Sequence, residues 1–225
     1  MTKYATRYPY TLGAPAMADR RGAQFVPAPV AKATADVVFY SWWRLDPHAH
    51  LAHLPGFDVE IAGDYRLVAE LARLDLAEIL ARVRAGHRPY IARLSGAPVA
   101  YGWSAANRAS IGELGLEFAI PARNRYLWDF ATLPAWRGIG IYPRLLQVIL
   151  SRESIEAERF WIGHVYGNSA SGRGIVKAGF GEAGATGCRD GRALTFAATG
   201  PASRARACAN LLGLGMSLSR SVRRT

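Results

Sequence analysis

The chain has 225 residues, half of them hydrophobic and a fifth charged, which is enough to bury one substantial core. Its 28 Lys and Arg against 17 Asp and Glu leave a formal net charge of +11, which favours polyanionic partners such as nucleic acid, anionic lipid or a phosphorylated cofactor. No run approaches the roughly 20 apolar residues of a membrane span and no apolar stretch follows the first basic residues, so we expect a cytoplasmic protein.

Cysteine and histidine usage gives no support for a metal site. Cys188 and Cys208 are too few for a disulfide framework or a four-ligand zinc site, and we expect free thiols in a reducing compartment. His48, His50 and His53 are close in sequence, but they stand in a Pro- and Gly-containing loop without a carboxylate or thiol arranged to help. We therefore predict no bound metal.

The first 56 residues show little regular pattern. Residues 1–35 are rich in Ala, Pro, Arg and Tyr without a helical or strand period, which predicts a flexible N-terminal arm. A lead-in segment, 36–56, contains the aromatic and β-favouring run 37–43. That run fits either a strand or a segment laid on the surface of the domain.

Regular periodicity extends from residue 57 to 198. Alternating or continuous apolar stretches predict strands at 58–61, 89–94, 98–103, 111–120, 126–133 and 160–166. Helical spacing predicts helices at 67–85, 143–159 and 170–178, and a final hairpin covers about 180–198. Because strand, helix, strand and helix follow one another from residue 126, the sequence predicts an α/β domain with a parallel strand pair at its centre.

The last segment, 199–225, is basic. It contains no acid, an apolar run interrupted by Gly213 and Gly215, and the arginines Arg204, Arg206, Arg220, Arg223 and Arg224. Glycines at these positions favour a tail that packs weakly or frays. A basic amphipathic helix in contact with an anionic membrane or nucleic acid is the alternative.

A glycine-containing turn joins strand 126–133 to the following helix. It reads Arg137-Gly138-Ile139-Gly140-Ile141-Tyr142. Free backbone N–H groups at a helix N-terminus bind phosphate, glycine lets a ligand approach the main chain, and arginine adds charge. Such a turn is also common as simple punctuation between elements. The chain lacks both G-x-x-x-x-G-K-[ST] and a G-x-G-x-x-G fingerprint at a strand–helix junction, which disfavours nucleotide hydrolysis and hydride transfer.

A second motif makes the pattern more specific. Asn168 and Ser171 follow strand 160–166, and the next helix closes with Lys177-Ala178-Gly179-Phe180. In this order, the two motifs resemble those of the GNAT superfamily of acetyl-CoA-dependent N-acyltransferases. The resemblance covers about residues 57–198. It implies an α/β (α+β) fold with a central mixed, largely antiparallel sheet, a splayed parallel strand pair and flanking helices.

The resemblance also implies a co-substrate, acetyl-CoA or another acyl-CoA, and its site. The pantetheine arm would lie between the diverging ends of strands 126–133 and 160–166, and Asn168 would bond it or simply cap the helix. The cofactor-binding residues so implied are Phe130, Ala131, Thr132, Leu133, Arg137, Gly138, Ile139, Gly140, Ile141, Tyr142, Asn168 and Ser171.

The sequence departs from the family pattern at two positions. Tyr142 stands where the family usually has a second small residue of the loop. Ile175 stands where a tyrosine often serves as general acid. Tyr166, Ser171 and Tyr142 are the substitutes that the sequence offers.

Acyl transfer to an amine also needs a proton acceptor, and a carboxylate meets that need. The candidates are Glu113 and Glu117, predicted on one face of strand 111–120, and Asp129 inside an apolar strand. Asp129 comes first because a charge in such a strand has to be explained by pairing or by function. The catalytic candidates are thus Asp129, Glu117, Glu113 and Tyr166.

Together these features predict an N-acyltransferase in which a primary amine, of a small molecule or a peptide, attacks acyl-CoA directly in a ternary complex. Two alternatives stay open. One is a degenerate CoA-binding GNAT domain without turnover. The other is a basic adaptor for nucleic acid or membrane, with the C-terminal tail contacting an anionic surface. The sequence fits a monomer or a homodimer equally.

Overall fold

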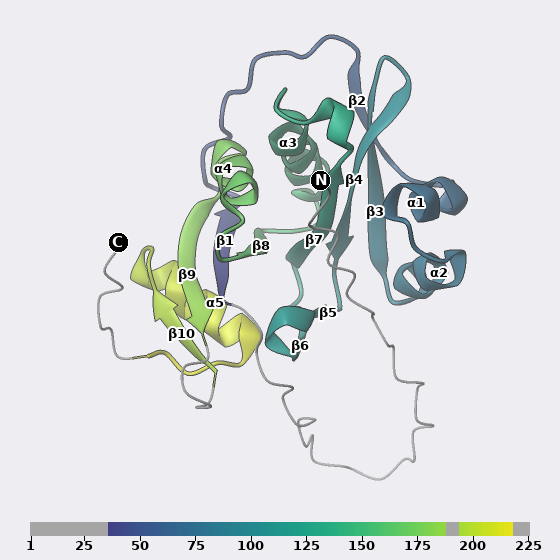
Figure 1. Ribbon diagram of the computed structural model, residues 1–225. Coiled ribbons are helices and arrows are strands. Elements are labelled where there is room, and N and C mark those ends of the chain that lie inside the picture. The colour runs from purple at the N-terminus through teal and green to yellow at the C-terminus, as the bar shows by residue number, and fades with distance from the viewer. Residues whose placement is uncertain (1–35, 188–193, 218–225) are drawn as a thin grey trace.

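The structure is a computed structural model that describes residues 36–187 and 194–217 (Figure 1). The predicted arm 1–35, Cys188, the turn of the last hairpin and residues 218–225 lie outside the described residues. Within the described part, the main sheet has eight strands in the order β10-β9-β1-β8-β7-β4-β3-β2. Its strands are β1 (Val37–Trp43), β2 (Phe57–Ile61), β3 (His87–Leu94), β4 (Ala97–Ala105), β7 (Asn124–Thr132), β8 (Arg159–Val165), β9 (Gly181–Gly187) and β10 (Thr195–Ala198).

The remaining elements are a small sheet and the helices. Strands β5 (Arg108–Ile111) and β6 (Leu116–Ala119) pair with each other. Two 3₁₀ helices, η1 (Gly112–Leu114) and η2 (Pro134–Trp136), precede β6 and α3. The α-helices are α1 (Tyr65–Ala72), α2 (Leu76–Arg84), α3 (Ile141–Glu153), α4 (Ser169–Lys177) and α5 (Ala202–Leu212). Among the described residues, no helix combines the length and the apolar character needed to cross a membrane.

One pair of neighbouring strands in the main sheet is parallel. Strands β7 and β8 align residues 124–127 with 159–162, whereas the other neighbouring strands of the sheet are antiparallel. The predicted mixed, largely antiparallel sheet with a parallel pair and flanking helices is confirmed.

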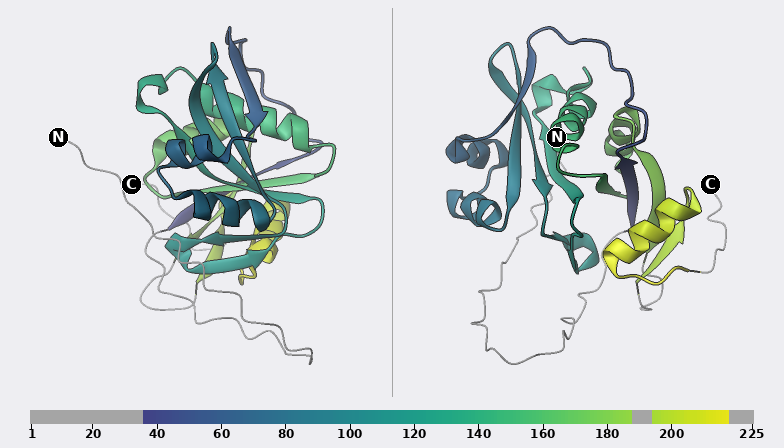
Figure 2. Two further views of the ribbon diagram at one scale, coloured as in Figure 1. Left: turned by 90° about the vertical axis from the view of Figure 1, so that its right-hand side faces the viewer. Right: turned by 180° about the vertical axis from the view of Figure 1, so that it is seen from behind.

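Helices cover both faces of the sheet (Figures 1 and 2). Residues Phe160 and Ile162 of β8 share a core with α3 and α4, whereas Trp161 shares a core with α5. Because successive side chains of a strand point to opposite faces, α3 and α4 lie on one face and α5 on the other. On the β3–β4 side, α1 and α2 cover the face opposite α3, since Trp103 packs with them and Ala100 with α3.

The predicted strand 111–120 is wrong. The chain leaves β5 at Ile111, makes η1 and resumes as β6 only after Gly115, whose φ is +58°. A glycine in this left-handed conformation ends the turn, and Leu114 is buried within it. Glu113 therefore lies on the 3₁₀ turn and Glu117 on β6, not on one face of a single strand.

The predicted helix 67–85 is two helices. Arg73 adopts φ +55° after α1, and α2 starts after Asp75. Asp64 caps α1, because its Oδ1 accepts from the amides of Arg66 and Leu67. The hydrophobic spacing continues across the break, which is why periodicity alone joined the two helices.

The folded unit extends beyond the predicted limits of 57 and 198. Strand β1 lies inside the sheet between β8 and β9, so it is a sheet strand rather than a surface segment. The expectation of a weakly packed tail is wrong for 202–212, because α5 buries Cys208 and Leu212 against Phe196 of β10. Gly213, at φ +65°, caps α5 instead of interrupting it.

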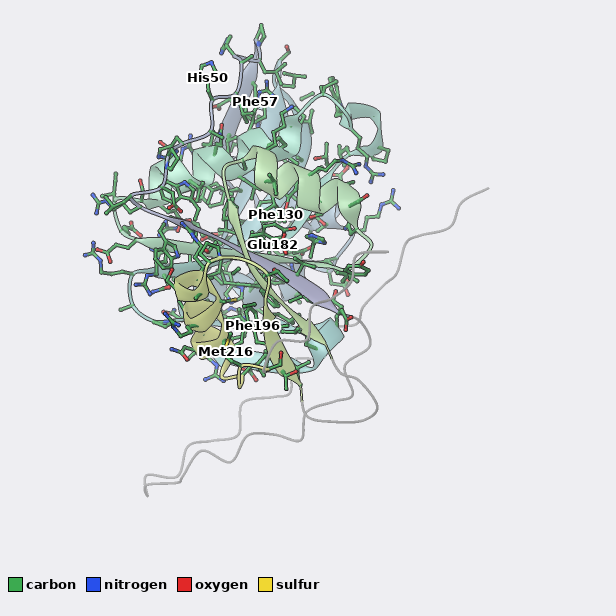
Figure 3. All side chains as sticks on the ribbon, turned by 90° about the vertical axis from the view of Figure 1, so that its left-hand side faces the viewer. His50, Phe57, Phe130, Glu182, Phe196 and Met216 are labelled. Carbon is green, nitrogen blue, oxygen red and sulfur yellow. The ribbon has the colours of Figure 1, made fainter. Side chains whose placement is uncertain are left out.

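The chain beyond α5 returns to the sheet edge. The amide of Phe196 donates to Gly215, the amide of Ser217 donates to Phe196, and a bridge joins Phe196 to Met216. Figure 3 shows the side chains of Phe196 and Met216 beside α5. Cys208 is a free, buried thiol whose pKa is raised by burial.

Candidate functional site

The parallel pair opens at one end. Beyond Leu127 and Ile162, β7 continues beside β4 and β8 continues beside β1. Residues 128–132 and 163–165 are therefore not paired with each other. Unpaired strand edges can bond an extended ligand. Helices α3 and α4 are the α-helices that come after β7 and β8 in the chain, and they lie side by side at this end of the molecule (Figure 1).

The turn before α3 leaves its main-chain donors free. Gly138 and Gly140 adopt φ +85° and +82°, and Gly140 is the N-cap of α3 without a side-chain cap bond. In the described part of the chain, none of the amides of residues 138–142 donates a hydrogen bond to another described residue. Free N–H groups and the positive end of the helix dipole make this turn suited to an anion.

Arg137 stands at the entrance of the turn with most of its donors available. Its Nε donates to the carbonyl oxygen of Thr132 at 3.0 Å, which anchors the side chain along the end of β7. Within the described residues, its two Nη atoms have no hydrogen-bond or ion-pair partner. The guanidinium is exposed, so its two Nη atoms can bond two oxygens of one phosphate group.

Tyr142 fills the space between β7 and α4. Its ring lies 5.5 Å from the ring of Phe130, and its hydroxyl lies 3.5 Å from Ser171 Oγ. A Cβ at Gly174 would stand 2.4 Å from the Tyr142 ring, so α4 receives this ring because it carries no side chain there. Burial raises the pKa of Tyr142 to about 12, and the hydroxyl is therefore a hydrogen-bond donor at neutral pH.

Asn168 is the N-cap of α4, with Oδ1 accepting from the amide of Ser171 at 3.1 Å. The side chain is exposed, and its Nδ2 has no partner among the described residues. The helix cap uses only the oxygen, so the two roles that the sequence offers for Asn168 do not compete. Ile175, where the resemblance to the GNAT superfamily implies a tyrosine, is fully buried.

Asp129 lies on a β-bulge. Its φ is +50°, and the register between β4 and β7 shifts there. Its Oδ2 accepts from Nη1 of the buried Arg82 at 2.5 Å, and Arg82 also donates to Glu78 at 2.7 Å. The Arg82 guanidinium lies 4.6 Å from the ring centroid of Trp128. The charge inside β7 thus has a structural partner on α2.

The structure does not gather the remaining catalytic candidates around Asp129. Glu117 is exposed on β6, where it pairs with Arg108 at 2.9 Å, and Glu113 lies on the turn before it. Figure 1 shows β5 and β6 at the end of the molecule opposite α3 and α4. Tyr166 is exposed directly after β8, and its amide donates to Asp36.

A tyrosine–histidine pair beside α4 was not predicted from the sequence. Tyr40 of β1 places its hydroxyl 3.3 Å from His164 Nε2, and His164 Nδ1 lies 2.9 Å from the carbonyl oxygen of Val165. Burial, and to a lesser degree Glu182, raise the pKa of Tyr40. A cavity of about 450 Å³ adjoins the pair, lined also by Ser169, Gly172, Arg173, Val176 and Lys177. Tyr40 and His164 come together because β1 pairs with β8, and no local sequence pattern predicts that pairing.

No protein-family model matches the sequence, and no curated protein is significantly similar to it. Solved structures do match. A GCN5-related N-acetyltransferase from Sphaerobacter thermophilus is 14% identical, with a TM-score of 0.50 over 68% of this chain and 50% of that one. A GNAT-family protein from Novosphingobium aromaticivorans is 17% identical, with a TM-score of 0.49 over 67% of this chain and 61% of that one.

A further match is yncA from Salmonella typhimurium, solved with its cofactor acetyl-CoA, at 18% identity and a TM-score of 0.44 over 62% of this chain and 89% of that one. This chain spans about half to three fifths of the length of the Sphaerobacter and Novosphingobium proteins. At such identities a structural match establishes the fold alone. The match at a TM-score of 0.50, together with the splayed parallel pair, shows that the chain has the fold of the GNAT superfamily.

Proposed function

We propose that this chain is an N-acyltransferase that uses acetyl-CoA or another acyl-CoA as donor and a primary amine as acceptor. The observation that carries the proposal is the free main-chain N–H groups of residues 138–142 at the start of α3, beside the opening between β7 and β8. A diphosphate needs several donors at once, and these amides, the helix dipole and Arg137 supply them.

The pantetheine arm of the donor is amide-containing and extended, which suits the unpaired edge of β7. Phe130, Ala131 and Thr132 lie on this edge, past the last residue that pairs with β8. Leu133 takes no part as a donor, since its amide already bonds Val99. The Nδ2 of Asn168 is a further donor, at the start of α4.

The chemistry needs a proton acceptor, an oxyanion donor and a donor for the leaving sulfur. The neutral amine attacks the thioester carbonyl, the tetrahedral oxyanion collapses, and the C–S bond breaks to release a thiolate. A main-chain N–H at the Asp129 bulge suits the oxyanion, because a bulge turns backbone groups out of the ladder. Asp129 remains our first candidate for the base, and Tyr142 and Ser171 remain candidates for donation to the sulfur.

Two observations favour a second candidate function, a CoA-binding domain without turnover. Ile175 puts an apolar side chain at the position of the usual acid, and Arg82 occupies the carboxylate of Asp129. This alternative uses the same diphosphate site. It differs from the first only in the chemical step.

Calorimetry and a thiol-release assay separate the proposals. We expect acetyl-CoA to bind the full chain and free thiol to appear when an acceptor from a panel of small-molecule and peptide amines is added. Binding without thiol release on the whole panel would favour the non-catalytic domain. Absence of any CoA binding would refute both.

A further inference from the structure

Arg144, in the first turn of α3, reaches back to the turn that precedes its own helix. Its Nη1 donates to the carbonyl oxygen of Gly140 at 2.9 Å and contacts that of Ile139 at 3.4 Å. Its Nη2 donates to the carbonyl oxygen of Ala52 at 2.7 Å. The guanidinium thus bonds three main-chain oxygens, two of them in the candidate diphosphate turn.

These bonds fix the direction in which the turn presents its amides. A trans peptide is planar, so its C=O and the N–H of the next residue point in opposite directions, and no described peptide bond is cis. Where the oxygens of Ile139 and Gly140 point toward Arg144, the N–H groups of Gly140 and Ile141 point away from it. Those are two of the amides that donate no hydrogen bond to any described residue.

We propose that Arg144 is a positioning residue for the diphosphate site: it holds the carbonyl side of the turn so that the amides of Gly140 and Ile141 face the ligand. The inference rests on the proposed function. It gives Arg144 a role distinct from that of Arg137, whose Nη atoms have no described partner and can bond the phosphate directly.

Glycine at position 140 is part of the same arrangement. A Cβ there would lie 2.4 Å from Arg144 Nη1, and the residue adopts φ +82°. A side chain at 140 would be strained by the backbone conformation and would also displace the guanidinium. The second glycine of the turn therefore serves the approach of Arg144 as well as the turn itself.

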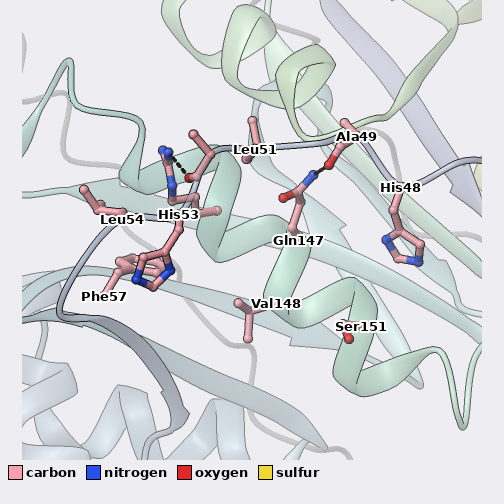
Figure 4. A pocket seen from close by; sticks show the side chains of 11 residues that line it. His48, Ala49, Leu51, His53, Leu54, Phe57, Gln147, Val148 and Ser151 are labelled. Atoms are coloured by element: carbon pink, nitrogen blue, oxygen red, sulfur yellow. Dashed lines mark hydrogen bonds between the residues drawn. The ribbon is translucent and has the colours of Figure 1, made fainter.

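The segment 44–56, which joins β1 to β2, provides the outer anchor for Arg144. It crosses α3, where Gln147 Nε2 donates to the carbonyl oxygen of Ala49 at 2.5 Å (Figure 4). Residues of the segment and of α3 together line a cavity of about 330 Å³, and Arg144 and Gln147 bond the segment at two separate carbonyl oxygens, those of Ala52 and Ala49. Arginine suits this task because its planar fork bonds several oxygens in fixed directions, which a lysine ammonium does not.

The test compares binding of CoA and of pantetheine, which lacks the diphosphate, to the full chain. We expect Arg144→Lys and Arg144→Met each to lower CoA affinity about tenfold, the order expected for losing a hydrogen bond to a charged group, and to leave pantetheine affinity unchanged. Arg152→Met, on the exposed last turn of the same helix, is the matched control and should change neither. Thermal unfolding checks that each variant is folded.

Three results would overturn the inference. If Arg144→Lys binds CoA as tightly as the wild type, a positive charge at this position is enough for CoA binding, and the guanidinium bonds do not position the turn. If both variants lose pantetheine and CoA affinity equally, the damage is general. If the loss in Arg144→Met vanishes at high salt, Arg144 acts as a screened charge. A wild-type chain that binds no CoA would instead refute the proposed function itself, and the inference with it.

Discussion

At the scale of single residues, Tyr142 and Gly174 form a complementary pair. A tyrosine stands in the first turn of α3, where a small residue is expected, and α4 accommodates its ring by carrying a glycine opposite. The ring then contacts Phe130 on β7, and the hydroxyl faces Ser171. The absence of a side chain at position 174 thus leaves the space that the Tyr142 ring fills between the two helices.

This complementarity predicts a coupled stability effect. Gly174→Leu places its side chain in the Tyr142 ring and should cost about 1–3 kcal/mol of unfolding free energy, as overpacking does. Combining it with Tyr142→Gly should recover part of that loss, so the double-mutant cycle is non-additive. Urea denaturation measures all four forms. Additive effects would show that the two residues do not share this space, and Val176→Leu on the exposed side of α4 serves as the control.

At the scale of elements, two that lie outside the periodic region 57–198, strand β1 and helix α5, belong to the folded domain: β1 lies inside the sheet and α5 packs on one face of it. Strand β1 lies between β8 and β9, and it joins β9, β10 and α5 to the rest of the sheet. Arg204 of α5 adds a polar link, since it donates to Ser41 of β1 and pairs with Asp46 at 2.5 Å. Helix α5 is therefore part of the folded domain.

The helix should therefore contribute measurably to stability. We expect Leu212→Ala to lower the unfolding free energy by about 2–5 kcal/mol, because it leaves a cavity in the core that α5 shares with Phe196. Leu45→Ala removes the same atoms from a side chain that is 97% exposed and should change stability by less than about 0.5 kcal/mol. Equal effects of the two variants on the denaturation midpoint would contradict the packing of α5.

Sequence and structure agree where the signal is local. The turn at Gly138 and Gly140 was predictable because the left-handed backbone that it needs is a property of glycine itself. The place of β1 was not, because pairing with β8 joins residues more than a hundred positions apart. The roles of two glycines were also not predictable from local pattern. Gly115 ends η1, but the alternation of residues around it predicted a continuous strand. Gly213 caps α5, but its place in an apolar run predicted a frayed tail. Asp129 was singled out as an unexplained charge, and its partner Arg82 lies on a helix 47 positions away.

At the scale of the whole molecule, a buried ionic network ties helices and strands together at the end of α3. Glu153, the last residue of α3, is 1% exposed and accepts from Tyr90 Oη at 2.7 Å and from Ser104 Oγ at 3.1 Å. Arg125 Nε lies 2.5 Å from it and supplies the counter-charge. One carboxylate thus connects α3 to β3, β4 and β7.

Removing the charge of Glu153 should destabilise the fold, although Glu153 lies at the end of α3 that is far from the candidate diphosphate turn. Glu153→Gln leaves Arg125 with a single carboxylate partner, the exposed Glu156, and should destabilise the fold by about 3–5 kcal/mol, as breaking a buried pair does. Differential scanning calorimetry measures the effect, and CoA affinity should be unchanged while the protein is folded. A stability loss below that of the control Glu158→Gln, an exposed pair with Arg123, would contradict this account.

The proposed function depends on diphosphate binding by main-chain amides at the start of α3. A crystal structure of the full chain with CoA tests it most directly. We expect diphosphate oxygens about 2.7–3.2 Å from main-chain nitrogens of residues 138–142, with the pantetheine arm between β7 and β8. A complex with the diphosphate bound elsewhere, and those amides bonded within the protein or to water alone, would contradict it.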